Sequence, residues 1–156
     1  MIDIAVPGRG HYSIEHLILD LNGTIALDGK IIRGVRERII TLSKNVNITV
    51  ATADTNRNAK KLLKDLPVTL HTIGESREGE HKGRLVREKG REVTVCVGNG
   101  SNDVLMLQES VIGICVVGRE GASKEAVLAS DLVVSSITDA LDLLLKSHRV
   151  KASLRR

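Results

Sequence analysis

Short apolar runs alternate with amphipathic segments along the sequence, and few folds accommodate this order. The apolar runs span residues 17–21, 47–51, 68–73, 93–97, 111–117 and 131–134. Helical patterns lie between and after them, over residues 34–43, 56–66, 80–89, 102–108, 123–129 and 137–146. An apolar run without a polar face is typical of a central strand that is covered on both sides. The alternation therefore predicts an α/β fold, a three-layer, doubly wound, mostly parallel sheet with helices on both faces.

The first 16 residues have a different pattern. Ile2–Val6 and Tyr12–His16 alternate apolar and polar residues with a period of two, and Pro7–Gly10 between them has turn chemistry. This pattern predicts an N-terminal β-hairpin over residues 1–16. The chain has 156 residues and no internal repeat or linker, so we expect one domain over residues 1–156.

Composition restricts the core and the class of partner. Apolar residues make up 42% of the chain, Phe and Trp are absent, and Tyr12 is the single aromatic residue. The core must therefore consist of Ile, Val, Leu and Ala, and stacking of bases on aromatic rings is excluded as a binding mode. Cys96 and Cys115 each lie inside an apolar run, and we expect them to be small core residues rather than a disulfide or metal pair.

The formal net charge of +4 is concentrated toward the end of the chain. Residues 148–156 form a basic tail, which is either a solvated, frayed terminus or an electrostatic contact for nucleic acid or another polyanion. No apolar run approaches the ~20 residues of a membrane span. The first residues lack the basic and apolar regions of a secretory signal. We therefore expect a cytoplasmic protein with no membrane partner.

Polar clusters follow three of the apolar runs. Asp20 stands at the end of the first run, residues 52–54 read Thr-Ala-Asp after the second, and residues 98–103 read Gly-Asn-Gly-Ser-Asn-Asp after the fourth. In open parallel sheets, ligands bind at the carboxyl ends of the strands. We therefore expect these clusters to meet at one edge of the sheet.

These clusters resemble the motifs of the haloacid dehalogenase superfamily of phosphohydrolases. Residues 20–24, Asp-Leu-Asn-Gly-Thr, match its D-x-x-G-T segment, and Thr52 stands where the second motif places Ser or Thr. Lys82 precedes the fourth strand in a helix, and residues 98–103 resemble the segment G-D-G-x-N-D. By pattern, the chain is most similar to the phosphorylation domains of P-type ATPases and the small soluble phosphatases related to them. The resemblance covers residues 17–145.

A site of this kind has a simple physical logic. A carboxylate at a strand end can attack phosphorus and form an aspartyl-phosphate, which divides one difficult displacement into two easier ones. Mg²⁺ offsets the repulsion between carboxylate and phosphate. Lys82 would add a positive charge and Thr52 a hydroxyl donor. Gly23 and Thr24 would let backbone N–H groups approach the phosphate oxygens.

The resemblance also implies individual roles. Asp20 would be the nucleophile and a metal ligand, and the backbone carbonyl of Asn22 a second ligand. Asp103 would contact Mg²⁺ directly or through water. The remaining positions implied are Asn99 for the metal, Ala53 for phosphate, and Asp54 and Asn102 as support for the site.

Each motif alone has a plainer interpretation. Residues 20–23 suit a turn, because Asp, Asn and Gly favour turns for local reasons. Thr52 or, in a better position, Asp54 could cap the helix that follows. Lys82 could be one more lysine on a solvated face. The four motifs in the expected order, each at the predicted place in the fold, favour the site over these alternatives.

Two positions depart from the pattern of an active phosphatase. Asn22 stands where the phosphatases have Asp as general acid and base, and an amide cannot exchange a proton at neutral pH. Asn99 stands where the first Asp of G-D-G-x-N-D would lie, so one negative metal ligand is missing. The sequence therefore predicts a slow Mg²⁺-dependent phosphohydrolase. The alternative is a non-catalytic module that binds a phosphoryl ligand or a partner and keeps the fold.

The expected substrate is a phosphorylated small molecule or a phosphoprotein. Residues 25–32 leave room for only a short flap, so we expect an open site without a cap domain. We expect no nucleic-acid partner, although binding through the basic tail is a separate alternative. The sequence is compatible with a homo-oligomer and does not identify the substrate.

Overall fold

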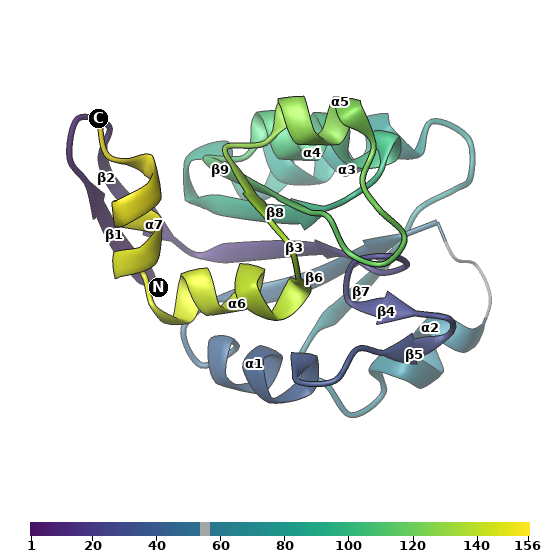
Figure 1. Cartoon of the computed structure of the whole chain (residues 1–156). Coiled ribbons are helices and arrows are strands. Elements are labelled where there is room, and N and C mark those ends of the chain that lie inside the picture. The colour runs from purple at the N-terminus through teal and green to yellow at the C-terminus, as the bar shows by residue number, and fades with distance from the viewer. Residues whose placement is uncertain (54–56) are drawn as a thin grey trace.

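A six-stranded parallel sheet forms the centre of the computed structural model, which describes residues 1–53 and 57–156 (Figure 1). The strand order is β10-β9-β8-β3-β6-β7. In chain order the strands are β3 (His16–Asp20), β6 (Asn47–Thr52), β7 (Thr69–Thr72), β8 (Thr94–Gly98), β9 (Ile112–Val116) and β10 (Leu132–Val134). Their ladders are all parallel, as the apolar runs predicted.

Helices cover both faces of this sheet (Figure 1). One layer contains α3 (Glu78–Lys89), α4 (Val104–Glu109) and α5 (Lys124–Ala129), and the other contains α1 (Val35–Leu42), α2 (Arg57–Leu63) and α6 (Ile137–Leu145). Two short 3₁₀ turns lie at Arg91–Val93 and Ser101–Asp103. The three-layer α/β architecture is therefore confirmed. Within the described part of the chain, no helix is long and apolar enough to cross a membrane.

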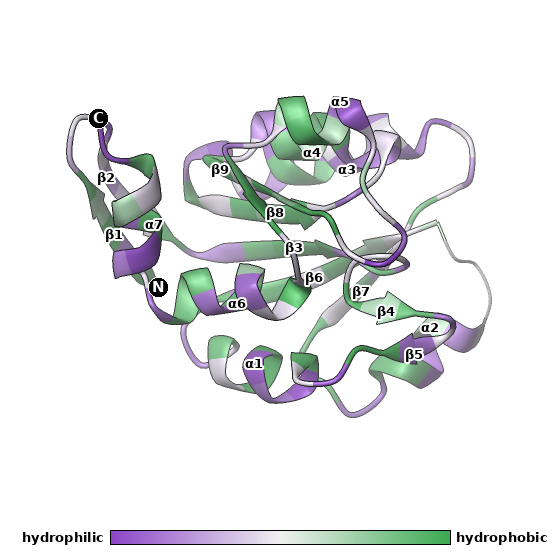
Figure 2. Cartoon of the chain, viewed as in Figure 1, coloured by the Kyte–Doolittle hydropathy of each residue, from purple (hydrophilic) through white to green (hydrophobic). Residues whose placement is uncertain are grey.

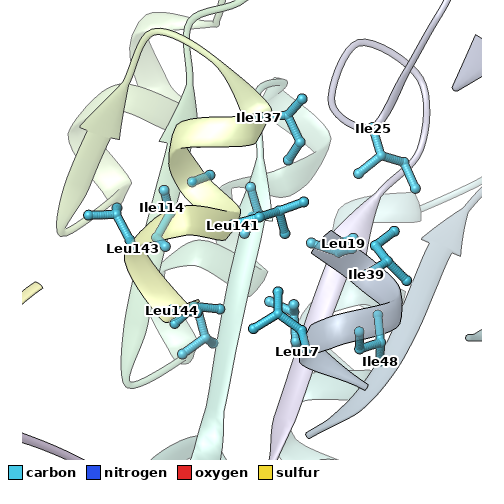
Figure 3. Packing of buried hydrophobic residues seen from close by; sticks show 14 of the residues in the cluster. Leu17, Leu19, Ile25, Ile39, Ile48, Ile114, Ile137, Leu141, Leu143 and Leu144 are labelled. Carbon is cyan, nitrogen blue, oxygen red and sulfur yellow. The ribbon is translucent and has the colours of Figure 1, made fainter. Parts of the chain in front are cut away.

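The strand side chains alternate between two apolar cores. Leu17 and Leu19 of β3 pack in the larger core with α1 and α6, whereas Ile18 packs in the smaller core with α3 and α4. Figure 3 shows Leu17 and Leu19 in the larger core, and Figure 2 shows the apolar colouring along the central strands. Cys96 and Cys115 are buried, free thiols in the smaller core, as expected. Burial on both faces explains why these strands read as continuous apolar runs.

The N-terminal hairpin pairs β1 (Ile2–Val6) with β2 (Gly10–Ile14) in antiparallel register. The second strand begins and ends two residues earlier than residues 12–16, because His16 already belongs to β3. Glu15 lies between the two strands, and its backbone N–H donates to the carbonyl of Val93. The chain therefore passes directly from the hairpin into the central sheet.

The basic tail is a helix, not a frayed terminus. Helix α7 (His148–Leu154) packs against β1, and both ends of the chain lie beside this hairpin (Figure 1). Val150 and Leu154 are buried in the larger core. The backbone N–H of Arg156 donates to the carbonyl of Pro7 at 3.0 Å. These two apolar side chains are four residues apart, so they lie on one face of the helix, and this face is buried. The many basic residues around them made this apolar pair hard to recognise in the sequence.

A short flap connects β3 to α1. It consists of β4 (Ala26–Leu27) and β5 (Lys30–Ile31), joined by Asp28 and Gly29 with φ values of 50° and 74°. Two consecutive positive φ angles are typical of a two-residue hairpin turn, in which Asp-Gly is a favoured sequence. The connection contains no inserted domain, so the expected absence of a cap at this position is confirmed.

Candidate active site

The register of the sheet places the three predicted clusters side by side. Asp20, the last residue of β3, pairs with Ala51 of β6, and the preceding Leu19 pairs with Val97 of β8. Thr52 and Gly98 are therefore each one residue beyond a partner of β3. Three adjacent parallel strands end at nearly the same level, which brings Asp20 between Thr52 of β6 and Gly98 of β8.

Asp20 and Lys82 form the centre of this group. Asp20 has the same strand parity as Ile18, so its side chain points toward the layer that contains α3. Lys82 on α3 is fully buried, and its Nζ donates to Asp20 Oδ1 at 2.7 Å and to Asp103 Oδ1 at 2.8 Å. Sixty-two residues separate Asp20 from Lys82 in the chain. Lysine is almost never fully buried unless it is paired. Lys82 is therefore held between these two carboxylates and does not lie on a solvated face.

The loop after β8 holds Asp103 in place. Asp103 Oδ2 accepts hydrogen bonds from the backbone N–H groups of Asn99 at 2.9 Å and Gly100 at 3.0 Å. A Cβ on Gly98 would lie 2.5 Å from the Asp103 carboxyl group, closer than real contacts allow. Glycine at residue 98 therefore provides the space that the buried carboxylate occupies.

Thr24 contacts Asp20 from the other side. Its Oγ1 donates to Asp20 Oδ2 at 3.1 Å, and Asn99 Oδ1 lies 3.4 Å from the same hydroxyl group. The backbone N–H groups of Gly23 and Thr24, which we expected to face phosphate, have partners within the chain. The N–H of Gly23 donates to the carbonyl of Ala26 at 2.8 Å and that of Thr24 to Leu21 at 3.3 Å, because this turn closes on itself. In this arrangement the Thr24 hydroxyl group, not these two N–H groups, reaches the site.

The two unusual amides occupy different surroundings. Asn22 is exposed on the turn before Gly23, whose φ is 78°. Asn99 is half-buried, and its Nδ2 donates to the carbonyl of Gly121 at 3.2 Å. Asn22 therefore has the exposure of a group that could contact a substrate, whereas Asn99 is part of the loop structure.

Glu78 is a site residue that the sequence analysis missed. Its Oε1 lies 3.1 Å from Lys82 Nζ, and its carboxylate is hydrogen-bonded to the Asn102 side chain and to the Ala53 backbone. Glu78 precedes Lys82 by four residues, a spacing that places the two on one face of a helix and could have indicated the contact. Asn102, expected to support the site, thus acts through Glu78.

The segment after β6 is described in part. Thr52 is buried, and its carbonyl accepts the N–H of Ile73 at 2.9 Å. The backbone of Ala53 is hydrogen-bonded to the Glu78 carboxylate. Asp54, the other expected supporting residue, lies outside the described residues.

Burial and charge shift the proton equilibria of this group. Burial and the nearby Asp103 carboxylate raise the pKa of Asp20 to about 7, and Lys82 offsets only part of the rise. Burial alone would lower the pKa of Lys82, but the carboxylates of Asp20 and Asp103 raise it overall. Burial alone would raise the pKa of Glu78, but the charge of Lys82 and the hydrogen bonds from Asn102, Lys82 and the Ala53 backbone lower it overall. The two carboxylates therefore keep Lys82 cationic, whereas burial and Asp103 favour the neutral form of Asp20.

The charges of this group fit a divalent cation. Three carboxyl groups surround one ammonium group, so full ionisation leaves an excess of two negative charges in a buried place. Among residues 1–53 and 57–156, no set of three or more His, Cys, Asp or Glu side chains is arranged as a metal cage. Mg²⁺ does not need such a cage, because it binds through one or two carboxylates and keeps several waters. Asp20 and Asp103 supply carboxylate oxygens of the required kind.

The matches to sequence relatives cover less than half of this chain. No protein-family model matches the chain. It is 48% identical over 71 residues to the uncharacterized protein MJ0073 of Methanocaldococcus jannaschii, a match that covers 46% of this chain and 76% of that protein. It is 40% identical over 67 residues to the phospholipid-transporting ATPase neo1 of Schizosaccharomyces pombe, covering 43% of this chain and 6% of the ATPase. The chain thus spans only a small part of the transport ATPases that it matches.

Solved structures share the whole fold. The cobalt-bound deoxy-D-mannose-octulosonate 8-phosphate phosphatase of Haemophilus influenzae superposes with a TM-score of 0.73 at 16% identity, over 90% of this chain and 92% of the enzyme. A putative haloacid dehalogenase-family hydrolase of Streptomyces avermitilis gives 0.69 at 20% identity, over 91% and 88%. Fold, motif order and sequence relatives agree. The chain has the fold of these haloacid dehalogenase-type hydrolases.

The solved relatives share this fold, and this chain has only a short flap between β3 and α1. A third solved relative is the 3-deoxy-D-manno-octulosonate 8-phosphate phosphatase of Moraxella catarrhalis, solved with magnesium, phosphate and the sugar acid. It has a TM-score of 0.67 at 15% identity and covers 90% of each chain. Such low identity carries the fold to this chain, whereas its substrate remains that of the Moraxella enzyme.

Proposed function

We propose that this chain is a slow, Mg²⁺-dependent phosphomonoester hydrolase that forms an aspartyl-phosphate on Asp20. The observation that carries the proposal is the contact of Lys82 Nζ with Asp20 Oδ1 at 2.7 Å and Asp103 Oδ1 at 2.8 Å at the ends of adjacent strands. A buried carboxylate, a permanent cation and a second acid at one place are the parts that phosphoryl transfer needs.

In the first step, one carboxylate oxygen of Asp20 attacks phosphorus while the bond from phosphorus to the ester oxygen breaks. Lys82 holds and orients the carboxylate, and its positive charge stabilises the phosphoryl oxygens. Thr24, whose hydroxyl group lies 3.1 Å from Asp20 Oδ2, holds the other oxygen. We assign Thr52 as a further hydroxyl donor. Mg²⁺, held by Asp20, Asp103, the carbonyl of Asn22 and the amide of Asn99, would neutralise charge when bound.

In the second step, water attacks the phosphorus of the aspartyl-phosphate and releases phosphate, which restores the Asp20 carboxylate. The leaving alkoxide of the first step takes a proton from solvent, and the attacking water loses one to solvent. An acid two residues after the nucleophile would assist both transfers, but Asn22 cannot. Slow turnover follows, because this assistance typically contributes about 10²–10⁴-fold.

The test is hydrolysis of p-nitrophenyl phosphate with Mg²⁺ and with a chelator, for the wild-type chain and for Asp20→Asn. We expect slow, metal-dependent release of nitrophenol that the substitution abolishes. Beryllium fluoride with Mg²⁺ should form an adduct on Asp20 that intact-mass measurement or fluorine resonance detects. Asp65→Asn is a matched control, since Asp65 is exposed after the end of α2 and lies outside the site. Equal activity in wild type and Asp20→Asn would disprove the assignment.

The second candidate is a module that binds a phosphoryl ligand or a partner without turnover. The exposed Asn22 side chain favours it, because the place of the general acid holds a group that cannot transfer a proton. Beryllium fluoride separates the two candidates. An active site of this type forms the adduct, whereas a module that has lost the chemistry binds inorganic phosphate without forming it.

A further inference from the structure

A cavity of about 540 Å³ opens beside the proposed nucleophile, between the flap and the first turn of α6. Gly23 and Thr24 are among the residues that line it, and the Thr24 hydroxyl group contacts Asp20. Ile31, Val116 and Ile137 contribute apolar wall. The volume lies in the range of about 300–1,000 Å³ that small-molecule sites occupy. The cavity is therefore in the right place, and large enough, to hold the part of a substrate that leaves.

Three cationic side chains line this cavity and no acidic one does: Lys30, Arg33 and Arg119. They come from two separate parts of the chain, since Lys30 and Arg33 belong to the flap region and Arg119 to the loop after β9. Within residues 1–53 and 57–156, none of the three forms an ion pair, although acids are plentiful on the surface. The convergence of unpaired cations gives the cavity a positive potential.

One carboxylate lies beside Gly23, a residue of the cavity lining. A Cβ on Gly23 would lie 2.3 Å from Glu120 Oε2, so the Glu120 side chain covers that residue. The balance at the cavity is therefore three cations against one acid. Glu120 is not itself part of the lining, so the cations remain in excess around whatever occupies the cavity.

These cations are separate from the phosphoryl site, because Lys82 pairs with Asp20, Glu78 and Asp103 and does not line the cavity, whereas Lys30, Arg33 and Arg119 do. A neutral leaving group would leave the three cations with only water to pair with. A leaving group that carries its own anion would gain charge-assisted hydrogen bonds, and arginine pairs with a carboxylate or a phosphate through two parallel bonds.

We propose that this cavity binds the leaving group of the substrate and that this group carries a second anion, a carboxylate or a further phosphate. The substrate class is thus a phosphomonoester with two separate anionic groups. This inference rests on the proposed phosphatase function. It goes further by assigning Lys30, Arg33 and Arg119 to recognition of the second anion.

Two pairs of substrates test the proposal, each differing only in the second anion. The carboxylate pair is 3-phosphoglycerate and glycerol 3-phosphate, and the phosphate pair is ethylene glycol bisphosphate and 2-hydroxyethyl phosphate. We expect kcat/KM to be at least about 10-fold higher for the doubly anionic member of one pair. A preference within the carboxylate pair identifies the second anion as a carboxylate, and a preference within the phosphate pair identifies it as a phosphate.

Variants locate the preference in the cavity. Arg33→Gln and Arg119→Gln, each made alone, should bring the ratio of kcat/KM within a pair close to one. Lys64→Gln, which removes an exposed lysine outside the cavity, should leave the ratio unchanged. Equal kcat/KM within both pairs for the wild-type chain overturns the inference and leaves the phosphatase function standing, as does a preference that both cavity variants retain.

A binding measurement covers the case in which no substrate turns over. Titration calorimetry of Asp20→Asn with Mg²⁺ should show the doubly anionic member of a pair binding at least about 10-fold more tightly. If this preference is found and Arg119→Gln removes it when added to Asp20→Asn, the anion site stands although the phosphatase function fails. If neither turnover nor selective binding is found, both are overturned.

Discussion

Lys82 Nζ lies 2.7 Å from Asp20 Oδ1, a contact between the end of a central strand and the buried face of a helix 62 residues later. The lysine side chain has no exposed surface, and the carboxylate is nearly as buried. Such a pair is costly to remove from water, and Asp103 and Glu78 complete the partners of its ammonium group. The fold therefore maintains a charged group where an apolar side chain would pack at less cost, which is expected of a functional site.

Replacing Lys82 by Met should reduce both stability and activity. The substitution keeps the volume but leaves the buried carboxylates of Asp20 and Asp103 without their cation, at a cost of about 3–5 kcal/mol in the free energy of unfolding. Turnover should fall by more than about 100-fold, because the charge on the phosphoryl oxygens is lost. Urea denaturation and p-nitrophenyl phosphate hydrolysis measure the two effects. Lys64→Met, at an exposed lysine, should change neither, and a Lys82→Met enzyme of wild-type activity would contradict the mechanism.

The free energy of unfolding should depend on pH through Asp20. Its pKa in the folded chain is about 7, caused by burial and by Asp103, whereas in the unfolded chain it is about 4. Between these values the folded state binds the extra proton, so this group's contribution to stability is complete below pH 4 and is lost as the pH rises to 7. The loss is at most about 1.4 kcal/mol per pH unit.

Comparison with Asp20→Asn isolates this contribution. In the presence of a chelator, the stability of wild type relative to Asp20→Asn should fall between pH 5 and pH 8 in urea denaturation. Lys82 stays protonated throughout this interval, so its interactions add no slope. Parallel pH profiles for the two proteins would show that Asp20 is already ionised at pH 5.

Asn22→Asp should accelerate turnover. Asn22 is exposed on the turn that follows the nucleophile, so a carboxyl group there can reach the leaving oxygen at little cost in stability. The gain should be at least about 10-fold and at most the 10²–10⁴-fold typical of general acid–base catalysis. Steady-state kinetics with p-nitrophenyl phosphate and Mg²⁺ measure it.

Asn99→Asp changes the second unusual amide and is compared with Asn22→Asp. It adds a negative ligand oxygen but loses the hydrogen bond from Asn99 Nδ2 to the carbonyl of Gly121, so stability should fall by about 1 kcal/mol while Mg²⁺ binds more tightly. The double variant should be faster than Asn22→Asp alone. If the double variant gains nothing over wild type, these amides do not limit the reaction.

The sequence predicted the elements that have strong periodicity and the places where chemistry would appear. Apolar runs buried on both faces, such as 17–21, leave an unmistakable pattern, and the strand-end rule then brought Asp20 and Asp103 together. The sequence could not predict the contact between Glu78 and Lys82 with the same certainty, because a glutamate four residues before a lysine is common on solvated helices. Only the docking of α3 against the sheet turns that ordinary pair into a buried contact.

Backbone hydrogen bonding was equally beyond the reach of the sequence. Gly23 and Thr24 match the motif whose N–H groups were expected to face phosphate, yet both donate within their own turn. Whether a turn closes on itself depends on the flap that follows, and the residue types do not report that. The interpretation of the tail as a frayed terminus was wrong for a related reason. Val150 and Leu154 form a buried apolar face only because the N-terminal hairpin packs next to α7.

The ion pair between Arg38 and Asp142 should stabilise the layer of α1 and α6. Arg38 Nε and Nη2 donate to the two Asp142 oxygens at 2.8 and 3.1 Å, and this pairing lowers the pKa of Asp142. Asp142→Asn should cost about 1 kcal/mol near neutral pH. Because the folded pKa is depressed, the contribution is present above the unfolded pKa of about 4 and is lost as the pH falls below it.

Urea denaturation at pH 7 and pH 3 checks this contribution. The difference between wild type and Asp142→Asn should be present at pH 7 and smaller at pH 3, and p-nitrophenyl phosphate turnover should be equal for both. A difference of the same size at both pH values would assign the effect to packing rather than to charge.

The packing of α7 against the N-terminal hairpin should contribute measurably to stability. Leu154 is 7% exposed and lies in the larger core, so Leu154→Ala should lower the free energy of unfolding by about 2 kcal/mol through lost apolar burial and a cavity. Lys151→Ala, on the exposed face of the same helix, should change it by less than about 0.5 kcal/mol. Equal, negligible effects of the two substitutions in urea denaturation would show that the terminus frays in solution and that α7 holds nothing in place.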